Sequence, residues 1–402
     1  MMRPNASLST IDVAILGAGP YGLSIAAHLN PLKVSYRIFG RPMQSWKSNM
    51  PKGMLLKSDG FASRLYDPDG AFTLGHYCAE TNQPYADVGI PVPVETFTEY
   101  GIEFQKRMVP SLEQVELISV KSVPQGFELT TESGERFLAR KFVVAAGITH
   151  FGWLPSELAA LPRELATHSS NYGDLSPFKG RKVALIGAGS SAVDVAVILR
   201  DIGAEPVIVT RARGIAFHNP PNEPRSLIER ITKPRSGLGL GWRSRLCTEA
   251  PLLFHAMPQG FRFRAVKRHL GPAPGWFVRE KASSIPTHLG VELRNADVRG
   301  EKVHLTLTDG TSSSGLVVDH VIGGTGYRVA LERLRFLDDE LRKKIHTAED
   351  TPVLNTYFES TVPGLYFVGV ASANSFGPLA RFAYGAMYTA RRISKHLGTR
   401  HA

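Results

Sequence analysis

Two short apolar runs that each end at a glycine dominate the pattern of hydrophobic and polar positions. The first run, residues 11–17, precedes a helical pattern at 21–29 and a second apolar run at 34–39. The same order returns between residues 181 and 209. A buried strand, a helix and a further strand form the repeating unit of a doubly wound domain. The sequence therefore predicts an α/β fold with two Rossmann-like dinucleotide-binding domains.

The remaining apolar segments predict further strands and a last helix. Residues 115–147 alternate between apolar and polar positions and end in a buried strand. A second buried strand is expected at 319–327, and a third at 364–370. The final helix is expected near 378–397. Residues 215–285 are rich in Pro, Gly and Arg, show no periodic pattern and resemble an insertion.

The bulk composition is that of a globular protein. With 402 residues, 43% hydrophobic and 21% charged, the chain is long enough for two hydrophobic cores. No stretch of about eighteen apolar residues occurs, and residues 1–10 lack the apolar centre of a signal peptide. We therefore expect a cytoplasmic protein without an integral membrane segment.

Cysteine and histidine spacing limits the chemistry. Cys78 and Cys247 are the only cysteines, and they form neither a CxxC pair nor a disulfide framework. This spacing argues against a dithiol reductase. His76, His150 and His218 have no partner at metal-ligand spacing, so no metal site is predicted.

The positive charge is concentrated in one segment. Residues 211–281 contain fourteen Arg or Lys and four Glu, which gives +10 of the chain's net +11. Such a segment suits either nucleic-acid binding or a basic lid over a phosphate-bearing cofactor or anionic substrate. We favour the lid and expect no nucleic-acid partner. The apolar run 252–254 within it suits a buried anchor better than a membrane or oligomer contact.

The first glycine turn, residues 17–22, reads Gly-Ala-Gly-Pro-Tyr-Gly and lies between strand and helix. There a pyrophosphate can approach bare backbone and the positive end of the helix dipole. The residues expected to bind a cofactor here are Gly17, Gly19, Pro20 and Gly22. The acidic residue that usually binds the ribose is missing, because Gly40 and Arg41 stand at the end of the second strand. Arg41 or backbone is expected to replace it.

The second glycine turn predicts a nicotinamide site. The expected cofactor contacts are Gly187, Gly189, Ser190 and Ser191, with alanine at position 192 in place of the third glycine. Arg211 and Arg213 follow the next strand, where a guanidinium can clamp a 2′-phosphate. NADPH is therefore favoured, with NADH still possible. The alternative is that both arginines are solvated surface charges.

These residues resemble the class B-type flavin monooxygenase superfamily, and within it the microbial N-hydroxylases and related flavin-dependent urate hydroxylases. The resemblance rests on both glycine turns and on three further segments: His168 to Tyr172, Gly324-Thr325-Gly326-Tyr327, and Met54 to Thr73. Trp46 resembles the tryptophan that follows the first unit in these enzymes. Thr325, Gly326, Tyr327, Trp46 and Gly369 are accordingly expected near the cofactors.

The resemblance implies a discontinuous FAD domain at residues 8–160 and 329–402, with an NAD(P)H domain at 161–328 inserted between them. It also implies FAD and NADPH as cofactors, molecular oxygen as co-substrate and a C4a-peroxyflavin that transfers one oxygen atom. The substrate is expected to be a small amine or a nitrogen heterocycle such as urate, with an anionic character suiting the basic segment. His168 is expected to be structural.

Three departures qualify the resemblance. The FxGxxxH fingerprint of Baeyer-Villiger enzymes is missing ahead of His168. Leu55 and Gly60 stand where the N-hydroxylases carry a flavin-facing glutamine and a substrate lysine, so Lys57 is the substitute candidate for substrate binding. The usual Gly-Asp pair appears as Gly369-Val370, and Asn374 becomes the candidate flavin contact, or else a cap of the last helix.

Three functions remain open at this stage. The first is a monooxygenase, the second an NAD(P)H oxidase or reductase without oxygen insertion, and the third a non-catalytic nucleotide-binding or nucleic-acid-binding protein. The motifs favour the first. The sequence predicts no oligomeric state.

Overall fold

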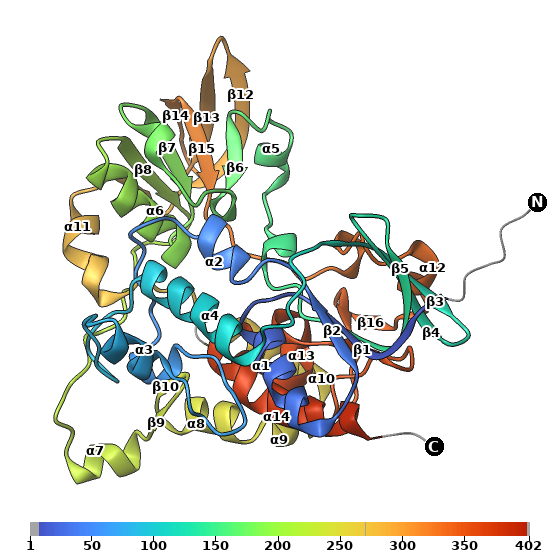
Figure 1. Ribbon diagram of the computed structural model, residues 1–402. Helices are drawn as coiled ribbons and strands as arrows, with labels where there is room; N and C mark the ends of the chain where they lie inside the picture. The colour runs from blue at the N-terminus through green and yellow to red at the C-terminus, as the bar shows by residue number, and fades with distance from the viewer. Residues whose placement is uncertain (1–7, 270, 400–402) are drawn as a thin grey trace, which may run out of the picture.

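The computed structural model describes residues 8–269 and 271–399, which form two lobes (Figure 1). The first sheet has the order β2-β1-β5-β4-β3, with β18 also paired to β5. β1, β2, β5 and β18 run parallel, whereas β3, β4 and β5 form an antiparallel meander. The strands are β1 (Thr10–Leu16), β2 (Tyr36–Phe39), β3 (Leu117–Val123), β4 (Gly126–Thr131), β5 (Arg136–Val144) and β18 (Leu365–Phe367).

The pairing of β18 with β5 joins the two ends of the chain. β5 pairs with β4 along its first half and with β18 along its last residues, where Phe367 is opposite Val144. Helix α14 (Ala386–Gly398) then packs against α1 (Pro20–Leu29). Ala390, Ile393 and Leu397 of α14 are buried at a spacing of three to four residues, which places them on one helix face. The C-terminal segment therefore completes the first lobe.

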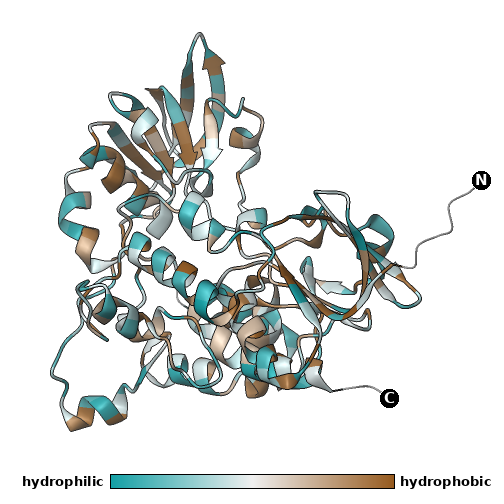
Figure 2. Cartoon of the chain, viewed as in Figure 1, coloured by the Kyte–Doolittle hydropathy of each residue, from teal (hydrophilic) through white to brown (hydrophobic). Residues whose placement is uncertain are grey.

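The second lobe contains a fully parallel sheet of order β11-β8-β7-β15-β6. Val183 and Leu185 of β7 enter the core on one face, and Ala184 enters the core on the other, because side chains alternate along a strand. In Figure 2 the central strands of this sheet are coloured as hydrophobic. Its strands are β6 (Ala166–His168), β7 (Lys182–Ile186), β8 (Glu205–Thr210), β11 (Thr287–Leu289) and β15 (His320–Gly323).

Different elements cover the two faces of this sheet. One face packs against α6 (Ser190–Asp201) and α11 (Arg279–Ser283). The other packs against an antiparallel sheet of β12 (Glu292–Arg299), β13 (Lys302–Thr308) and β14 (Ser313–Val318). The helix α5 (Ser156–Ala159) also contributes Leu158 to this second core.

Shorter elements surround the first glycine turn. α2 (Gln44–Ser48) and the 3-10 turn Gly60–Ala62 flank the irregular stretch that follows β2. α3 (Leu74–Glu80) and α4 (Val94–Met108) pack on each other, and Phe97, Tyr100 and Phe104 of α4 are fully buried. α12 (Asp339–Lys344) and the small strand pair β16 (Thr347–Ala348) and β17 (Thr351–Pro352) precede β18.

Residues 215–285, which show no periodic pattern in the sequence, contain regular structure. The segment forms several short helices: α7 (Leu227–Thr232), α8 (Trp242–Glu249), α9 (Pro251–Ala256), α10 (Gln259–Arg268) and α11. A hairpin of β9 (Arg235–Ser236) and β10 (Gly239–Leu240) joins α7 to α8. These helices have at most ten residues, and many of their apolar side chains face solvent. They therefore lack the periodic apolar pattern by which a helix is predicted from sequence.

The last helix begins later than expected. Residues 378–385 form two 3-10 turns, and α14 starts at Ala386 with Gly385 at its N-cap. Asn374 lies in the separate helix α13 (Ala373–Phe376), so the alternative that it caps the last helix is wrong. The buried anchor expected at 252–254 is only partly present, because Phe254 is buried whereas Leu252 and Leu253 are exposed.

Candidate functional site

The first glycine turn has the geometry of a phosphate cradle. Gly17 has φ 110°, and a Cβ on Gly22 would lie 1.8 Å from the Gly17 carbonyl oxygen. Only glycine therefore fits at position 22. Nothing lies within 4 Å of a Cβ built on Gly19, which is the N-cap of α1 and supplies no capping side chain. The first amides of α1, next to Pro20, are thus open to an anionic ligand.

The end of β2 carries no carboxylate that is free for a ribose. Glu113 pairs with this strand, since its carbonyl oxygen accepts the Gly40 amide at 3.0 Å. Its carboxylate, however, forms a two-pronged ion pair with Arg37, with both contacts at 2.6 Å. Arg41 is exposed at this edge. Glu113 therefore does not replace the acidic residue that usually binds the ribose, and Arg41 stays the candidate for that contact.

Tyr21 fastens the C-terminal segment to the first glycine turn. Its hydroxyl donates to the carbonyl oxygens of Phe382 at 2.9 Å and Ala380 at 3.1 Å. Gly369, with φ 67°, follows β18 and lies against the Tyr21 ring. The Asn374 amide instead donates to Thr351 Oγ1 at 3.0 Å, which gives it a structural contact in the C-terminal segment. Its role as a flavin contact stays a prediction.

The second glycine turn repeats this geometry at the start of α6. Gly187 has φ 132°, and a Cβ there would lie 2.5 Å from the Gly324 carbonyl oxygen. Ala192 packs against Gly324, where any added Cβ would clash at 2.5 Å. Gly189 is the N-cap of α6 and again supplies no capping side chain. The amides of Ser190 and Ser191 are therefore available in the first turn of the helix.

Arg211 and Arg213 lie beyond the carboxyl end of β8, and both are exposed. That is the edge where a parallel sheet binds nucleotides. No carboxylate lies within ion-pair distance of either guanidinium in the described part of the chain. Both arginines are accordingly free for a phosphate ligand.

Residues 271–274, which we call the strap, lie over the start of α6. A Cβ on Gly189 would lie 3.0 Å from the Cβ of Pro272. Ser190 Oγ donates to the Ala273 carbonyl oxygen at 3.0 Å. The strap therefore covers part of the surface that a pyrophosphate would approach, and the lid role of the basic segment stays a prediction.

Lys57 connects the first lobe to the strap, and Asp194 lies near enough to act on its charge. Lys57 Nζ donates to the Ala273 carbonyl oxygen at 3.1 Å. Although its side chain keeps contact with solvent, desolvation by the surrounding protein lowers the pKa of Lys57, and the charge of Asp194 opposes that shift. The flavin-facing stretch predicted from the sequence thus lies against the first turns of α6.

Asp194 was not predicted as a site residue. Burial raises the pKa of its carboxyl to about 7, and the charge of Lys57 opposes the shift. Its Oδ1 is buried and has no hydrogen-bond partner among the described residues. The signal was present, because Asp194 is the one acidic residue in the apolar stretch 192–199. A buried carboxyl without a partner beside a cofactor site is a candidate ligand contact.

Two connections between the lobes run side by side. Gly152, which follows β5, pairs with Tyr327, which follows β15. His168 contacts both: its ring lies against Gly152, and its protonated Nε2 donates to the Gly326 carbonyl oxygen at 2.9 Å, while its Nδ1 accepts from Ser170 N–H. Burial lowers the pKa of His168, and its ring lies edge-on to Tyr327. His168 is therefore a neutral structural link. Thr325 donates to the Trp153 carbonyl oxygen at the same place.

A further contact joins α2 to the second lobe. Asn49 Nδ2 donates to the Ser170 carbonyl oxygen at 2.8 Å, and Lys52 N–H donates to the Gly173 carbonyl oxygen at 3.0 Å. Trp46 of α2 is half-buried and packs edge-on against Phe97. Trp46 thus lies on the face of the first lobe that meets the second.

The arrangement fits two dinucleotides. Each lobe presents a long helix whose N-terminus is reached through a glycine turn and left without a side-chain cap. No group of three His, Cys, Asp or Glu side chains suited to a metal ion occurs among the described residues. Within the same residues, no helix has the length and hydropathy needed to cross a bilayer.

Comparison with known proteins places this geometry in a family. The model of the pyridine nucleotide-disulphide oxidoreductase family matches residues 14–236, from the first glycine turn through the second. The chain belongs to this family, which confirms the expectation of an oxidoreductase. Cys78 and Cys247 are nevertheless both free, so this member lacks the cysteine pair that the family's description would suggest.

Curated relatives that match the sequence bear the name ferredoxin–NADP reductase. A ferredoxin–NADP reductase of Symbiobacterium thermophilum is 26% identical over 220 residues, which cover 52% of this chain and 56% of the reductase. The chain spans about half the length of the curated relatives that it matches.

Solved structures of similar fold align along nearly the whole chain. An ornithine N-hydroxylase of Kutzneria, solved with reduced FAD, NADP⁺ and L-ornithine, gives a TM-score of 0.73 at 16% identity and covers 96% of this chain and 99% of its own. A bacillithiol disulfide reductase of Staphylococcus aureus gives 0.64 at 19% identity, with coverages of 97% and 98%. The expected fold class, that of two-domain flavoproteins, is confirmed.

Proposed function

We propose that the protein is an FAD-dependent monooxygenase that oxidises NADPH and inserts one oxygen atom of O2 into a small nucleophilic substrate. One observation carries the proposal. Lys57, in the stretch predicted to face the flavin, and Ser190, in the helix predicted to bind NADPH, donate to the same carbonyl oxygen, that of Ala273, at the junction of the two lobes. A flavin and a nicotinamide bound at the two glycine turns would meet there.

FAD bound at the first turn would supply a redox centre that accepts a hydride and activates oxygen. The chain itself positions the reactants. The amides at the start of α1, beside Gly19, hold the pyrophosphate of FAD, and those at the start of α6, beside Gly189, hold that of NADPH. Arg211 and Arg213 bind the 2′-phosphate. The strap covers the start of α6 before NADPH binds and moves aside when the dinucleotide enters.

The proposed substrate is an amine or a nitrogen heterocycle such as urate. Lys57 is the proposed anchor for an anionic group on the substrate, and the buried carboxyl of Asp194 supplies a second polar contact. Protonated below about pH 7, Asp194 can donate as well as accept a hydrogen bond. The N-hydroxylase of similar fold binds L-ornithine, which supports a small amine.

A second candidate function is electron transfer without oxygen insertion. The sequence match to ferredoxin–NADP reductases favours it, because that match covers 52% of a chain without a dithiol pair. In this alternative the same flavin would pass electrons to a protein or quinone acceptor.

Isotope incorporation separates the two functions. The purified protein is supplied with NADPH, ¹⁸O2 and a panel of small amines and nitrogen heterocycles, while NADPH loss, peroxide and labelled products are measured together. The monooxygenase predicts one labelled product for each NADPH consumed with at least one panel member. Quantitative peroxide with every panel member, together with rapid reduction of ferredoxin or a quinone, would favour the alternative.

We also propose the division into an interrupted FAD domain and an inserted NADPH domain. The first sheet draws strands from residues 10–144 and 365–367, and the second from residues 166–323. The paired connections at Gly152 and Tyr327 support crossing points near those residues. The core contact of Leu158 with the second lobe supports assigning α5 to the NADPH domain.

A further inference from the structure

Large apolar side chains are exposed mainly in one segment. Of eighteen such side chains among the described residues, ten lie within residues 227–261. They are Leu227, Ile228, Ile231, Leu240, Trp242, Leu246, Leu252, Leu253, Met257 and Phe261. Leu227 and Ile228 are each 74% exposed and Ile231 is 69% exposed, the highest values in this group. Isolated exposed apolar residues are ordinary, but a cluster of this size marks an interaction surface.

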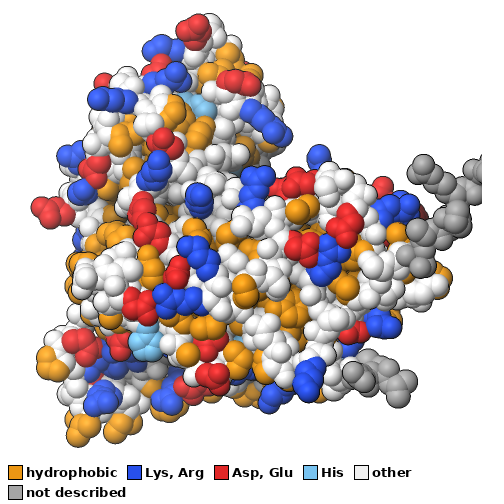
Figure 3. All heavy atoms as spheres, in the orientation of Figure 1, with side chains coloured by type: hydrophobic (Ala, Val, Ile, Leu, Met, Phe, Trp, Pro, Cys, Tyr) orange, Lys and Arg blue, Asp and Glu red, His pale blue; other side chains and the backbone are white. Residues whose placement is uncertain are grey.

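Five of these side chains lie on the adjoining helices α7 and α8. Trp242 Nε1 donates to the Ile231 carbonyl oxygen at 3.1 Å, which ties α8 to the end of α7. Trp242 and Leu246 are four residues apart and share a face of α8. We call Leu227, Ile228, Ile231, Trp242 and Leu246 the apolar tip. In Figure 1, α7 projects from the body of the molecule at the lower left, and Figure 3 shows hydrophobic side chains gathered at that corner.

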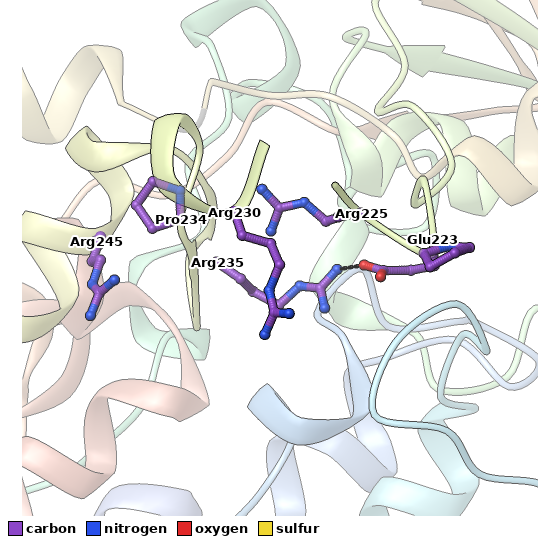
Figure 4. Close-up of a pocket in the computed structure, with 7 residues that line it drawn as sticks. Glu223, Arg225, Arg230, Pro234, Arg235 and Arg245 are labelled. Atoms are coloured by element: carbon purple, nitrogen blue, oxygen red, sulfur yellow. Dashed lines mark hydrogen bonds and ion pairs between the residues drawn. The ribbon is translucent and has the colours of Figure 1, made fainter. Parts of the chain in front are cut away.

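Arginines surround the apolar tip and line a cavity of about 670 Å³ beside it. Four arginines and one glutamate line this cavity, as Figure 4 shows: Arg225, Arg230, Arg235, Arg245 and Glu223. Glu223 pairs with Arg235, and Arg245 pairs with Glu249.

Two arginines at the tip have no ion-pair partner. Arg230 and Arg243 are exposed, and neither has a carboxylate within ion-pair distance in residues 8–269 and 271–399, whereas the charge of Lys233 acts on Glu229. The surface therefore combines aliphatic and tryptophan side chains with unpaired positive charge.

We propose that the apolar tip docks on the surface of an anionic lipid bilayer. Its aliphatic side chains would enter the interfacial region while the surrounding arginines bind lipid headgroup phosphates, with the cavity receiving one of them. Trp242 suits this position, because tryptophan concentrates at the boundary between headgroups and acyl chains. The contact is peripheral. It does not depend on the proposed oxygen insertion.

Charge decides between the occupants that could cover this surface. A symmetric pair of chains would place the tip against its own copy, and so would set residues 223–249, with six Arg or Lys, three Glu and a net charge of +3, against the same residues of the second copy. Such a contact is repulsive, whereas an anionic bilayer complements the charge over a wide area. The projection of α7 away from the body also suits insertion into a soft, flat surface.

Vesicle flotation tests the proposal with the full chain. Vesicles of phosphatidylglycerol mixed with phosphatidylcholine are expected to carry the protein, and pure phosphatidylcholine vesicles are not. The double variant Ile228→Asp, Ile231→Asp is expected to lower the partition coefficient at least about tenfold, since it removes two aliphatic contacts and adds two negative charges. Arg230→Glu changes the charge by two and is expected to lower it on the order of 20-fold.

Matched controls lie at the other end of the molecule. Val298→Asp and Arg299→Glu make the same changes in β12, where Val298 is 40% exposed. Both are expected to bind vesicles like the wild type, and all variants should keep its thermal unfolding midpoint because every changed side chain is exposed. Equal binding to neutral and anionic vesicles, or equal loss in the β12 controls, would overturn the proposal. So would a dimer in sedimentation that Ile228→Asp dissociates without any vesicle binding.

Discussion

Lys57 Nζ and the carbonyl oxygen of Ala273 lie 3.1 Å apart in a hydrogen bond that connects the first lobe to the strap. Ser190 of α6 donates to the same carbonyl oxygen. One backbone group thus joins the stretch predicted to face the flavin, the basic segment and the helix predicted to bind NADPH. Because the strap also contacts Gly189 through Pro272, the dinucleotide can reach α6 only if the strap shifts.

NADP⁺ binding is therefore expected to move the strap. The amide of His218 donates to the Pro274 carbonyl oxygen at 2.9 Å, so its hydrogen exchange reports on the strap directly. We predict that NADP⁺ speeds exchange at His218 and slows it at Ser191 and Ala192. The amide of Leu23 in α1 serves as the control and should not change. Slower exchange at His218 would mean that the strap closes over the dinucleotide rather than leaving it.

Two alanine substitutions separate folding from cofactor binding at the first glycine turn. Gly19→Ala meets no neighbouring atom, so the variant should fold with the stability of the wild type and yet bind FAD on the order of tenfold to a hundredfold more weakly. Gly22→Ala places a methyl group 1.8 Å from the Gly17 carbonyl oxygen. It should lower the free energy of unfolding by roughly 1–3 kcal/mol or more. Thermal melts and flavin content of the purified variants give both quantities; normal flavin content in Gly19→Ala would contradict the cradle.

Arg211 and Arg213 should set the preference for NADPH. Removing a charged hydrogen-bond donor to a phosphate costs roughly 1.5–3 kcal/mol, so Arg211→Ala or Arg213→Ala should raise the Kd for NADP⁺ by on the order of tenfold or more. The Kd for NAD⁺ should stay the same. Arg181→Ala, at the opposite end of the parallel sheet, is the control. Titration calorimetry measures each Kd, and a wild-type preference for NAD⁺ would refute this assignment.

The pKa of Asp194 predicts a pH-dependent stability. The pKa of this carboxyl is about 7 in the folded protein and 3.8 ordinarily. The carboxyl therefore contributes most to the free energy of unfolding below about pH 4, and this contribution is lost as pH rises through about 7. The free energy of unfolding of Asp194→Asn, relative to that of the wild type, should therefore rise by roughly 2 kcal/mol as the pH is raised from about 5 to about 8. Asp201→Asn, at the exposed end of the same helix, should show no such trend. Denaturant unfolding at about pH 5 and pH 8 measures this difference. The same difference between variant and wild type at both pH values would show that Asp194 ionises in the folded protein as easily as in the unfolded chain.

The two strand-helix-strand units could be predicted because local pattern and turn chemistry agree in both. Apolar strands, glycine turns and buried helices occur where the sequence predicts them, as in β1 with α1 and β7 with α6. The basic segment could not be predicted, since its short helices expose their apolar residues and depend on contacts such as Arg262 with Ser375. The late start of α14 follows from the 3-10 turns before it, which share its apolar pattern.

The site was only partly predictable for a related reason. Residues 57, 194 and 273 are far apart in sequence, and nothing in the local pattern places them together. Asp194 carried a local signal as an acid in an apolar helix. The strap carried none, because its position depends on the packing of the whole basic segment.

The most direct test of the central claim is the visible flavin absorbance of the purified protein during anaerobic addition of NADPH, followed by oxygen and substrate. The account predicts that FAD is bound, that one equivalent of NADPH bleaches it, and that the bleaching is far slower with NADH. Oxygen should then restore the absorbance and yield one oxygenated product for each flavin. A protein that binds no flavin, or whose flavin NADPH does not bleach, would contradict the account.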